Sequence, residues 1–257
     1  RRHVAARLGT APDLAPLADL VRAAADRPGW RPVTVDATAL HDAGPTDVDA
    51  LAAAVATGVA YVRHLEAAGI TPAQAFDQIE FRVGASADQF LTAAALRALR
   101  RVWARVGEAS GVPEASRGAR THAVTSLRMF TREDPWVNVL RSTLATFGAS
   151  IGGADAITVL PFDTVLGLPE RLGRRLARNT QILLADEANV ARVTDPGGGS
   201  WYLESLTDDV ARAVWARFQQ IEASGGAVQA LPACLVASCV ADAAAQRHRD
   251  LATRSRP

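Results

Sequence analysis

Short apolar segments alternate with long amphipathic ones along most of the chain. Four segments are rich in β-branched residues and bounded by Gly, Pro or Asp, so they predict strands: 33–38, 79–84, 120–126 and 156–162. Segment 47–68 instead has apolar residues spaced three or four positions apart, which predicts one buried helix face. That face consists of Val48, Leu51, Val55, Val59, Val62 and Leu65.

The order of these segments predicts the fold class. Strand and helix alternate four times, which is typical of an α/β protein whose helices cover a parallel sheet. The units recur roughly every 40 residues, which favours a barrel over an open doubly wound sheet. A closed (β/α)8 TIM barrel needs eight strands. We therefore expect half of a barrel followed by trailing helices.

Local signals predict where two helices begin. Thr71 before Pro72 predicts a helix start, because a hydroxyl can cap the first turn and proline suits its first position. Thr207, followed by two aspartates, predicts the cap of a later helix.

The stretch TDPGGGSWYLE, residues 194–204, holds three consecutive glycines. It lacks the lysine of a P-loop and the spaced glycines of a dinucleotide fingerprint. Pro196 fixes its own φ and glycines accept positive φ, so the stretch predicts a structural turn.

Composition narrows the function classes. With 49% hydrophobic residues and a net charge of +1, the chain has no charge bias toward nucleic acid or anionic membranes. No apolar run approaches the ~18 residues that span a bilayer. Cys234 and Cys239 lie in an apolar run, which predicts reduced, buried thiols and a cytoplasmic location, and offers too few ligands for a metal. A start at Arg1 without a signal peptide suggests a piece of a longer chain.

Extended segments of the chain resemble the methylmalonyl-CoA mutase family. The resemblance rests on RLARNTQ through DPGGGSWYLE in 175–215, on TREDPWVNVL through VLPFDTVLGLP in 131–169, on RTHAVTS and on VDATALHDAG in 35–65. It implies strands five to eight of a (β/α)8 barrel over residues 1–225. Residues 226–257 would be a trailing helical segment that leads toward a C-terminal domain.

The resemblance also implies a chemistry. The family barrel holds an acyl-CoA along its axis and faces adenosylcobalamin, and a radical 1,2-shift interconverts methylmalonyl-CoA and succinyl-CoA. A separate flavodoxin-like domain carries the lower ligand of the cobalamin.

At the catalytic positions the chain departs from the family motif. Ala39 stands where active members have the catalytic histidine, and Thr38 replaces the tyrosine before it. His41 lies two residues further on and would be aimed differently. In the next strand, Gln78, Ile79 and Glu80 replace the Arg-Leu-Ser that holds CoA, and an acidic residue would repel that anion.

The later strands also differ from the motif. Val124 replaces a glutamine, Leu127 replaces a glycine that lines the cofactor, and Thr164 replaces a glutamate that meets the corrin. Of the chemical positions only His122 remains, so it is a weak candidate for substrate binding. A hydrogen-bonded structural histidine is the alternative.

These departures imply a non-catalytic relative, similar to the small subunits of the family. Such a chain would bind no cofactor itself and would pair with a catalytic large subunit that carries adenosylcobalamin. Candidate interface side chains are Trp136, Trp201, Tyr202 and Trp215. Two alternatives stay open: an active mutase for another acyl-CoA, with His41 and His122 in new roles, and an unrelated barrel enzyme.

Overall fold

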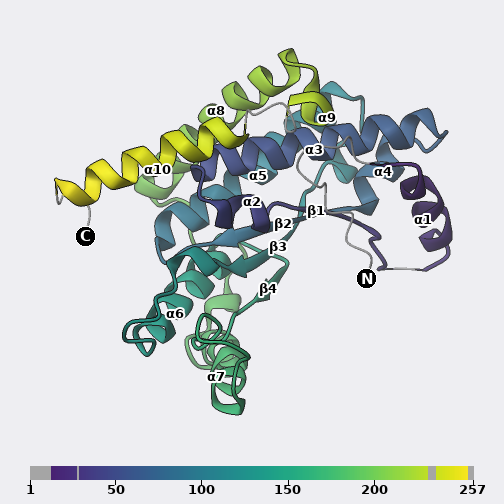
Figure 1. Cartoon of the computed structure of the whole chain (residues 1–257). Coiled ribbons are helices and arrows are strands. Elements are labelled where there is room, and N and C mark those ends of the chain that lie inside the picture. The colour runs from purple at the N-terminus through teal and green to yellow at the C-terminus, as the bar shows by residue number, and fades with distance from the viewer. Residues whose placement is uncertain (1–12, 28, 231–235, 254–257) are drawn as a thin grey trace.

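The structure is a computed structural model that describes residues 13–27, 29–230 and 236–253 (Figure 1). Cys234 lies outside these ranges, and the side chain of Cys239 is not described either. The expectation of reduced, buried thiols therefore stays a prediction.

All four predicted strands form one parallel sheet in the order β1-β2-β3-β4. The strands are β1 (Val33–Asp36), β2 (Ile79–Ala85), β3 (Arg120–Thr125) and β4 (Ala156–Thr158). Each strand pairs with its neighbour in sequence, so the chain winds in one direction without the reversal of a doubly wound sheet. The α/β class is therefore confirmed.

Two strands end earlier than their sequence pattern predicts. Thr38 starts a helix instead of ending β1, because its backbone N–H donates to the Asp36 carboxylate at 3.0 Å. In the fourth strand the Leu160 N–H donates to the hydroxyl of Thr125 at 2.8 Å, so it leaves the strand ladder. At the ends of β1 and β4, side-chain oxygens thus compete with the neighbouring strand for backbone N–H groups.

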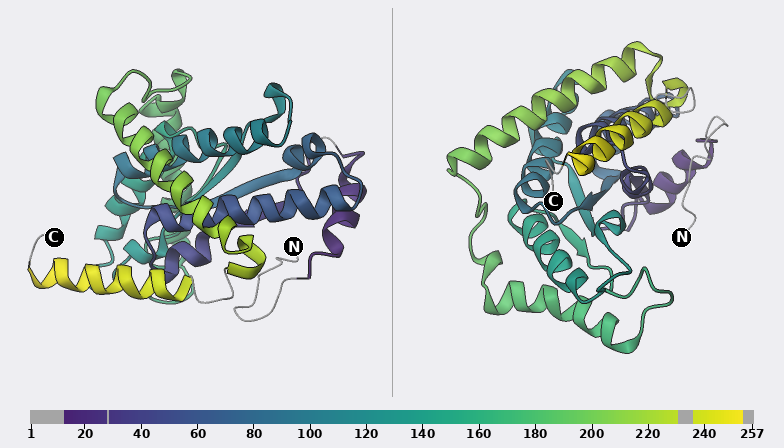
Figure 2. Two further views of the ribbon diagram at one scale, coloured as in Figure 1. Left: turned by 90° about the horizontal axis from the view of Figure 1, so that it is seen from above. Right: turned by 60° about the vertical axis from the view of Figure 1, so that its left-hand side comes forward.

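The helices that follow the strands cover one face of the sheet. They are α3 (Asp47–Ala67), α5 (Gln89–Ala109), α6 (Val137–Ile151) and α7 (Arg171–Ile182). Figure 2 shows them along an arc outside the sheet. The further helices are α1 (Pro16–Ala24), α2 (Thr38–Ala43), α4 (Pro72–Gln78), α8 (Trp201–Ala223), α9 (Gly226–Ala230) and α10 (Val236–Ala252). Short helical turns are η1 (Glu114–Ser116), η2 (Leu127–Met129), η3 (Leu183–Glu187) and η4 (Val190–Arg192).

An aromatic cluster forms the centre of the core between the sheet and its helices. Trp103 of α5 is fully buried, stacked on Phe76 at 4.3 Å and edge-on to Phe81 at 4.8 Å between ring centroids. Gly58 of α3 admits this ring, since a Cβ there would lie 2.9 Å from Trp103. Side chains of β2 alternate between buried and half-buried, so only one face of the sheet belongs to the core.

Helix α3 matches its predicted limits and apolar face. Leu51, Val55, Val59, Val62 and Leu65 are buried, while Val48 is half-buried. Contrary to the sequence expectation, α3 is long and apolar enough to cross a membrane by length and composition alone. However, 67% of its apolar window is buried against other elements, as in the core helix of a globular protein.

The predicted cap at Thr71 is confirmed, whereas the one at Thr207 is wrong. Thr71 and Gln74 form a reciprocal capping box at the start of α4. Helix α8 begins at Trp201 with Ser200 as its cap, because the glycine turn itself leads into the helix. Thr207 lies inside α8, and its hydroxyl donates to the carbonyl of Leu203 at 2.7 Å.

The glycine stretch is a turn, as predicted. A Cβ on Gly197 would lie 2.3 Å from the Leu203 side chain, and Gly199 has a φ of +78°. Arg97 of α5 pairs with both Asp195 and Glu204, which fixes the turn and the first turn of α8 onto α5. Close packing and backbone conformation therefore account for two of the glycines.

Candidate functional site

The face of the sheet opposite the helices carries polar side chains on neighbouring strands, among them Asp36, Arg82 and His122, and we call it the polar face. Asp36 accepts a hydrogen bond from Arg82 at 2.8 Å, across the β1–β2 pair. Burial of the Asp36 carboxylate would raise its pKa, but hydrogen bonds from Thr38 and Arg82 outweigh it and lower the pKa. The guanidinium of Arg82 therefore already has an anionic partner within the chain.

His122 of β3 belongs to the same polar face. Its Nε2 lies 2.8 Å from the hydroxyl of Thr158 on β4. Its Nδ1 lies 3.7 Å from the Glu80 carboxylate on β2. The ring is thus held between the two neighbouring strands.

A second polar cluster lies beyond the carboxyl ends of the strands, where α/β barrels place their chemistry. Nε2 of His41 in α2 lies 2.8 Å from the hydroxyl of Ser126. Nδ1 of His41 lies 3.2 Å from the carboxylate of Asp47 at the start of α3. Burial alone would raise the pKa of Asp47, but pairing with His41 and the charge of Arg128 outweigh it and lower the pKa.

The His41 ring crosses the end of β2 to reach β3. A Cβ on Gly84 would lie 2.5 Å from the ring, so only glycine leaves room for it. Arg128 donates to the carbonyl of Pro45 at 3.0 Å and so holds the loop between α2 and α3. The cluster thus joins the segments after β1 and β3.

The side chains of Ser126, His41 and Asp47 contact one another in the spatial order serine–histidine–aspartate, which is also the order in the catalytic triad of serine hydrolases. However, Ser126 is only 2% exposed and His41 only 4%. A nucleophile must be reached by its substrate, so the burial of these side chains favours a structural role over a catalytic one. We call His41 with its two partners, Ser126 and Asp47, the clamp. Sequence reasoning missed Ser126 and Asp47, since no local pattern links residues 41, 47 and 126.

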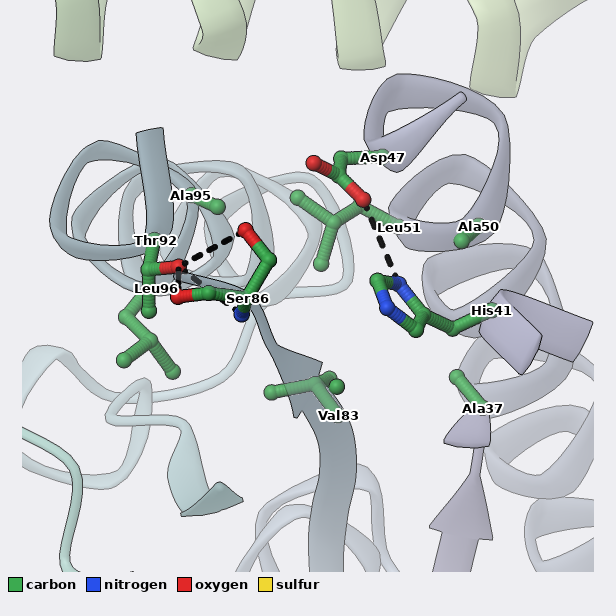
Figure 3. A pocket seen from close by; sticks show the side chains of 11 residues that line it. Ala37, His41, Asp47, Ala50, Leu51, Val83, Ser86, Thr92, Ala95 and Leu96 are labelled. Carbon is green, nitrogen blue, oxygen red and sulfur yellow. Dashed lines mark hydrogen bonds and ion pairs between the residues drawn. The ribbon is translucent and has the colours of Figure 1, made fainter. Parts of the chain in front are cut away.

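A small pocket adjoins the clamp (Figure 3). His41 and Asp47 lie on one side of it, and Ser86 and Thr92 on the other. The two hydroxyl residues bond to each other: the Ser86 N–H donates to the Thr92 hydroxyl at 3.1 Å, and that hydroxyl donates to the Ser86 carbonyl at 3.0 Å. The remaining walls are Ala37, Ala50, Leu51, Val83, Gly84, Ala95 and Leu96.

Within the described ranges, no group of three or more His, Cys, Asp or Glu side chains is placed to hold a metal ion.

Comparison with known proteins shows where this architecture belongs. The family model described as methylmalonyl-CoA mutase matches residues 9–257. The chain belongs to the methylmalonyl-CoA mutase family.

Relatives within the family carry two kinds of name. The methylmalonyl-CoA mutase small subunit of Propionibacterium freudenreichii subsp. shermanii is 53% identical over 98% of the chain and 40% of its own length. The protein of the same name from Streptomyces virginiae is 53% identical over 95% of the chain and 39% of its own length. The methylmalonyl-CoA mutase of Escherichia coli is 32% identical over 91% of the chain. The chain thus spans about two fifths of the small subunits that it matches.

Positions that the mutase motif matches to substrate contacts differ in exposure and in the element that carries them. Ala39 is exposed in the first turn of α2, and Gln78 ends α4, where it is half-buried. Ile79 is buried in the core, whereas Glu80 faces His122. Val124 is buried beside the clamp, in register with Gly84.

Positions that the mutase motif matches to the corrin do not fit that group. Leu127 puts a branched side chain, 40% exposed, where the motif has glycine. The Thr164 hydroxyl donates to the Pro161 carbonyl at 2.6 Å and brings no carboxylate. Asp163 is buried and accepts the Glu170 N–H at 2.8 Å, which anchors the segment before α7.

The four candidate interface aromatics differ in exposure. Trp201 and Tyr202 are 92% and 61% exposed at the start of α8, and Trp136 is 57% exposed before α6. Trp215 is half-buried against Phe218.

Proposed function

We propose that this chain is part of a non-catalytic small subunit of methylmalonyl-CoA mutase that supports a catalytic large subunit. The observation that carries the proposal is the polar face of the sheet. Its cationic groups are already paired, Arg82 with Asp36, and Glu80 faces His122 where the family motif has a serine near CoA. A CoA phosphate would meet a carboxylate there instead of a free guanidinium, which disfavours binding.

The same proposal includes a half-barrel. Sequential parallel strands with helices on one face support strands five to eight of a (β/α)8 barrel, because the sheet lacks a reversal of strand order. In that barrel the polar face would line the axis. We place the end of the barrel segment near residue 225, since Gly225 and Gly226 both take positive φ after α8, and assign 226–257 to a trailing helical segment.

Adenosylcobalamin is assigned to the partner subunit in this proposal. Leu127 and Thr164 offer neither the space nor the carboxylate that the family motif has beside the corrin, and Ala39, Gln78 and Val124 lack the side chains of the substrate contacts. The protein names of the similar small subunits support a larger partner. A cytoplasmic location, with neither nucleic acid nor membrane as a partner, belongs to the same proposal.

Two measurements test the proposal. The intact subunit that contains this chain, purified alone with adenosylcobalamin, should not isomerise methylmalonyl-CoA. Co-expressed with a catalytic large subunit, it should elute from a sizing column as a 1:1 complex with one equivalent of cobalamin, measured by absorbance. Turnover by the single subunit, two equivalents of cobalamin per pair, or a failure to associate would contradict the proposal.

A further inference from the structure

Helix α6 exposes a row of apolar side chains that no other part of the described ranges covers. Trp136, Leu140, Leu144 and Phe147 are spaced four, four and three residues apart, so they share one side of the helix. Trp136 is 57%, Leu140 65% and Leu144 43% exposed, and Phe147 is partly exposed. We call these four side chains the α6 ridge. At 1.5 Å per residue the ridge is about 17 Å long.

Charge is nearly absent from this helix. Arg141 is its one charged residue, and the guanidinium is held by the Thr131 hydroxyl at 3.0 Å and the Asn138 side-chain oxygen at 2.9 Å. Helix α7 beside it carries four arginines in its twelve residues. An exposed helix face without charges is unusual for a surface in contact with water, and large apolar patches mark interaction sites.

The side of α6 opposite the ridge is already used for packing within the chain, since it carries the buried residues Asn138, Ala145 and Ala149. On the flank next to the ridge, Gly148 and Gly152 let α6 approach α5 closely: a Cβ on Gly148 would lie 2.8 Å from the Gln89 carbonyl, and one on Gly152 would lie 2.9 Å from the Ala93 Cα. Figure 2 places α5 on one side of α6 and α7 on the other. In a barrel each outer helix has two helical neighbours, so α6 has both of its own and the ridge points away from the barrel.

One end of the ridge is rigid. The ring of Trp136 stacks on Phe162 at 4.6 Å between centroids, with 22° between the planes. Residues that dominate binding energy are often such pre-ordered aromatic side chains, surrounded by apolar groups that exclude water.

We propose that the α6 ridge is the centre of the contact with the large subunit, and that the partner presents an uncharged, apolar surface to it. This inference rests on the proposed function, which supplies an unlike partner. Four side chains cover less than the ~800 Å² that one protein contributes to a standard interface, so further contacts surround the ridge. The lack of charge in the ridge excludes recognition by ion pairs there.

The test substitutes Leu140→Glu and Leu144→Glu together, which places two charges in the ridge without lowering helix propensity much. Leu20→Glu on α1 is the matched control, because Leu20 is exposed to 43%, as Leu144 is. Each intact subunit is titrated with the large subunit, and association is measured by light scattering after size exclusion. The double variant should raise the Kd at least about thirtyfold, and the control should leave it unchanged.

Each outcome decides the proposal. Unchanged affinity of the double variant would overturn the ridge as the contact while leaving the proposed function intact. A wild-type subunit that does not bind the large subunit contradicts the proposed function itself. A wild-type homodimer that the double variant abolishes would show that a second copy occupies the ridge, which overturns the choice of partner.

Hydrogen exchange gives a second readout that does not depend on how the variant folds. In the wild-type subunit, peptides over residues 136–147 should gain protection when the large subunit is added, and peptides around Leu20 should not. Equal exchange of the 136–147 peptides with and without the partner would overturn the proposal.

Discussion

The His41 clamp is set by a few atoms at the carboxyl end of β2. Its ring is fixed at both nitrogens, by Ser126 and Asp47, and lies directly over Gly84. The ring cannot move without losing both contacts. A side chain larger than that of glycine therefore does not fit at position 84. Buried polar groups that lose a partner cost about 1–3 kcal/mol each.

Gly84→Ala should therefore lower the stability of the intact subunit by about 2 kcal/mol, since its Cβ collides with the His41 ring. Combined with His41→Ala, the same change should cost less than the sum of the two single changes, because the obstacle is gone. Gly118→Ala is the control, as a Cβ there meets nothing within 4 Å. Thermal unfolding measures all four variants, and strictly additive losses would contradict the clamp.

Asp47 makes the clamp sensitive to acid. Its pKa is lowered in the folded state, so its pairing stabilises the fold above the pKa of about 3.9 in the unfolded chain and is lost as the pH falls through the folded value. Asp47→Asn should thus destabilise the fold near pH 5, and the loss should become smaller as the pH falls below the pKa of the unfolded chain. Asp42→Asn, an exposed position, controls for net charge. Urea unfolding near pH 5 and below that pKa would reveal a pH-independent loss if this assignment is wrong.

At the scale of elements, the glycine turn and α8 depend on one arginine of α5. Arg97 is nearly buried and contacts both Asp195 before the turn and Glu204 in α8. Its neighbour Arg101 also pairs with α8, through Asp208, but 54% of its side chain is exposed. Exposed ion pairs contribute little, whereas the Arg97 side chain is only 11% exposed and joins carboxylates from two different segments, so its pairs are less screened by water.

Arg97→Gln should free the turn, and amide exchange across residues 194–204 should accelerate about tenfold, which corresponds to roughly 1.4 kcal/mol of local stability. Arg101→Gln should change this exchange by less than about twofold. Mass spectrometry of the two variants side by side makes the comparison. Equal effects of both substitutions would show that Arg97 has no special role.

For the whole molecule, the sheet is open over the residues that the structure describes. Among these residues, strands β1 and β4 each have a neighbour on one side only, and the polar face has no covering layer. Unpaired strand edges promote association, and only closure of the sheet removes them.

If the proposed half-barrel is correct, residues 1–257 expressed alone should self-associate or fold poorly, whereas a longer form that includes the other half of that barrel should be monodisperse. Light scattering and calorimetry compare the two. A monomeric fragment that melts cooperatively would contradict the half-barrel.

The sequence by itself determined the four strands, the limits of α3 and the cap of α4, because these depend on the spacing of apolar residues and on local hydrogen bonds. It also identified the family, through segments spread along the chain. It misplaced the start of α8 at Thr207, since a hydroxyl before acidic residues resembles a cap wherever it stands.

Only the tertiary structure brought His41, Asp47 and Ser126 together, since they lie on three different elements and share no local pattern. It also decided which apolar residues face outward: the spacing of Leu140 and Leu144 defines one side of a helix, and the opposite side is buried in the fold through Ala145 and Ala149. Which side of a helix is buried depends on neighbours that are distant in sequence, and this information is absent from periodicity.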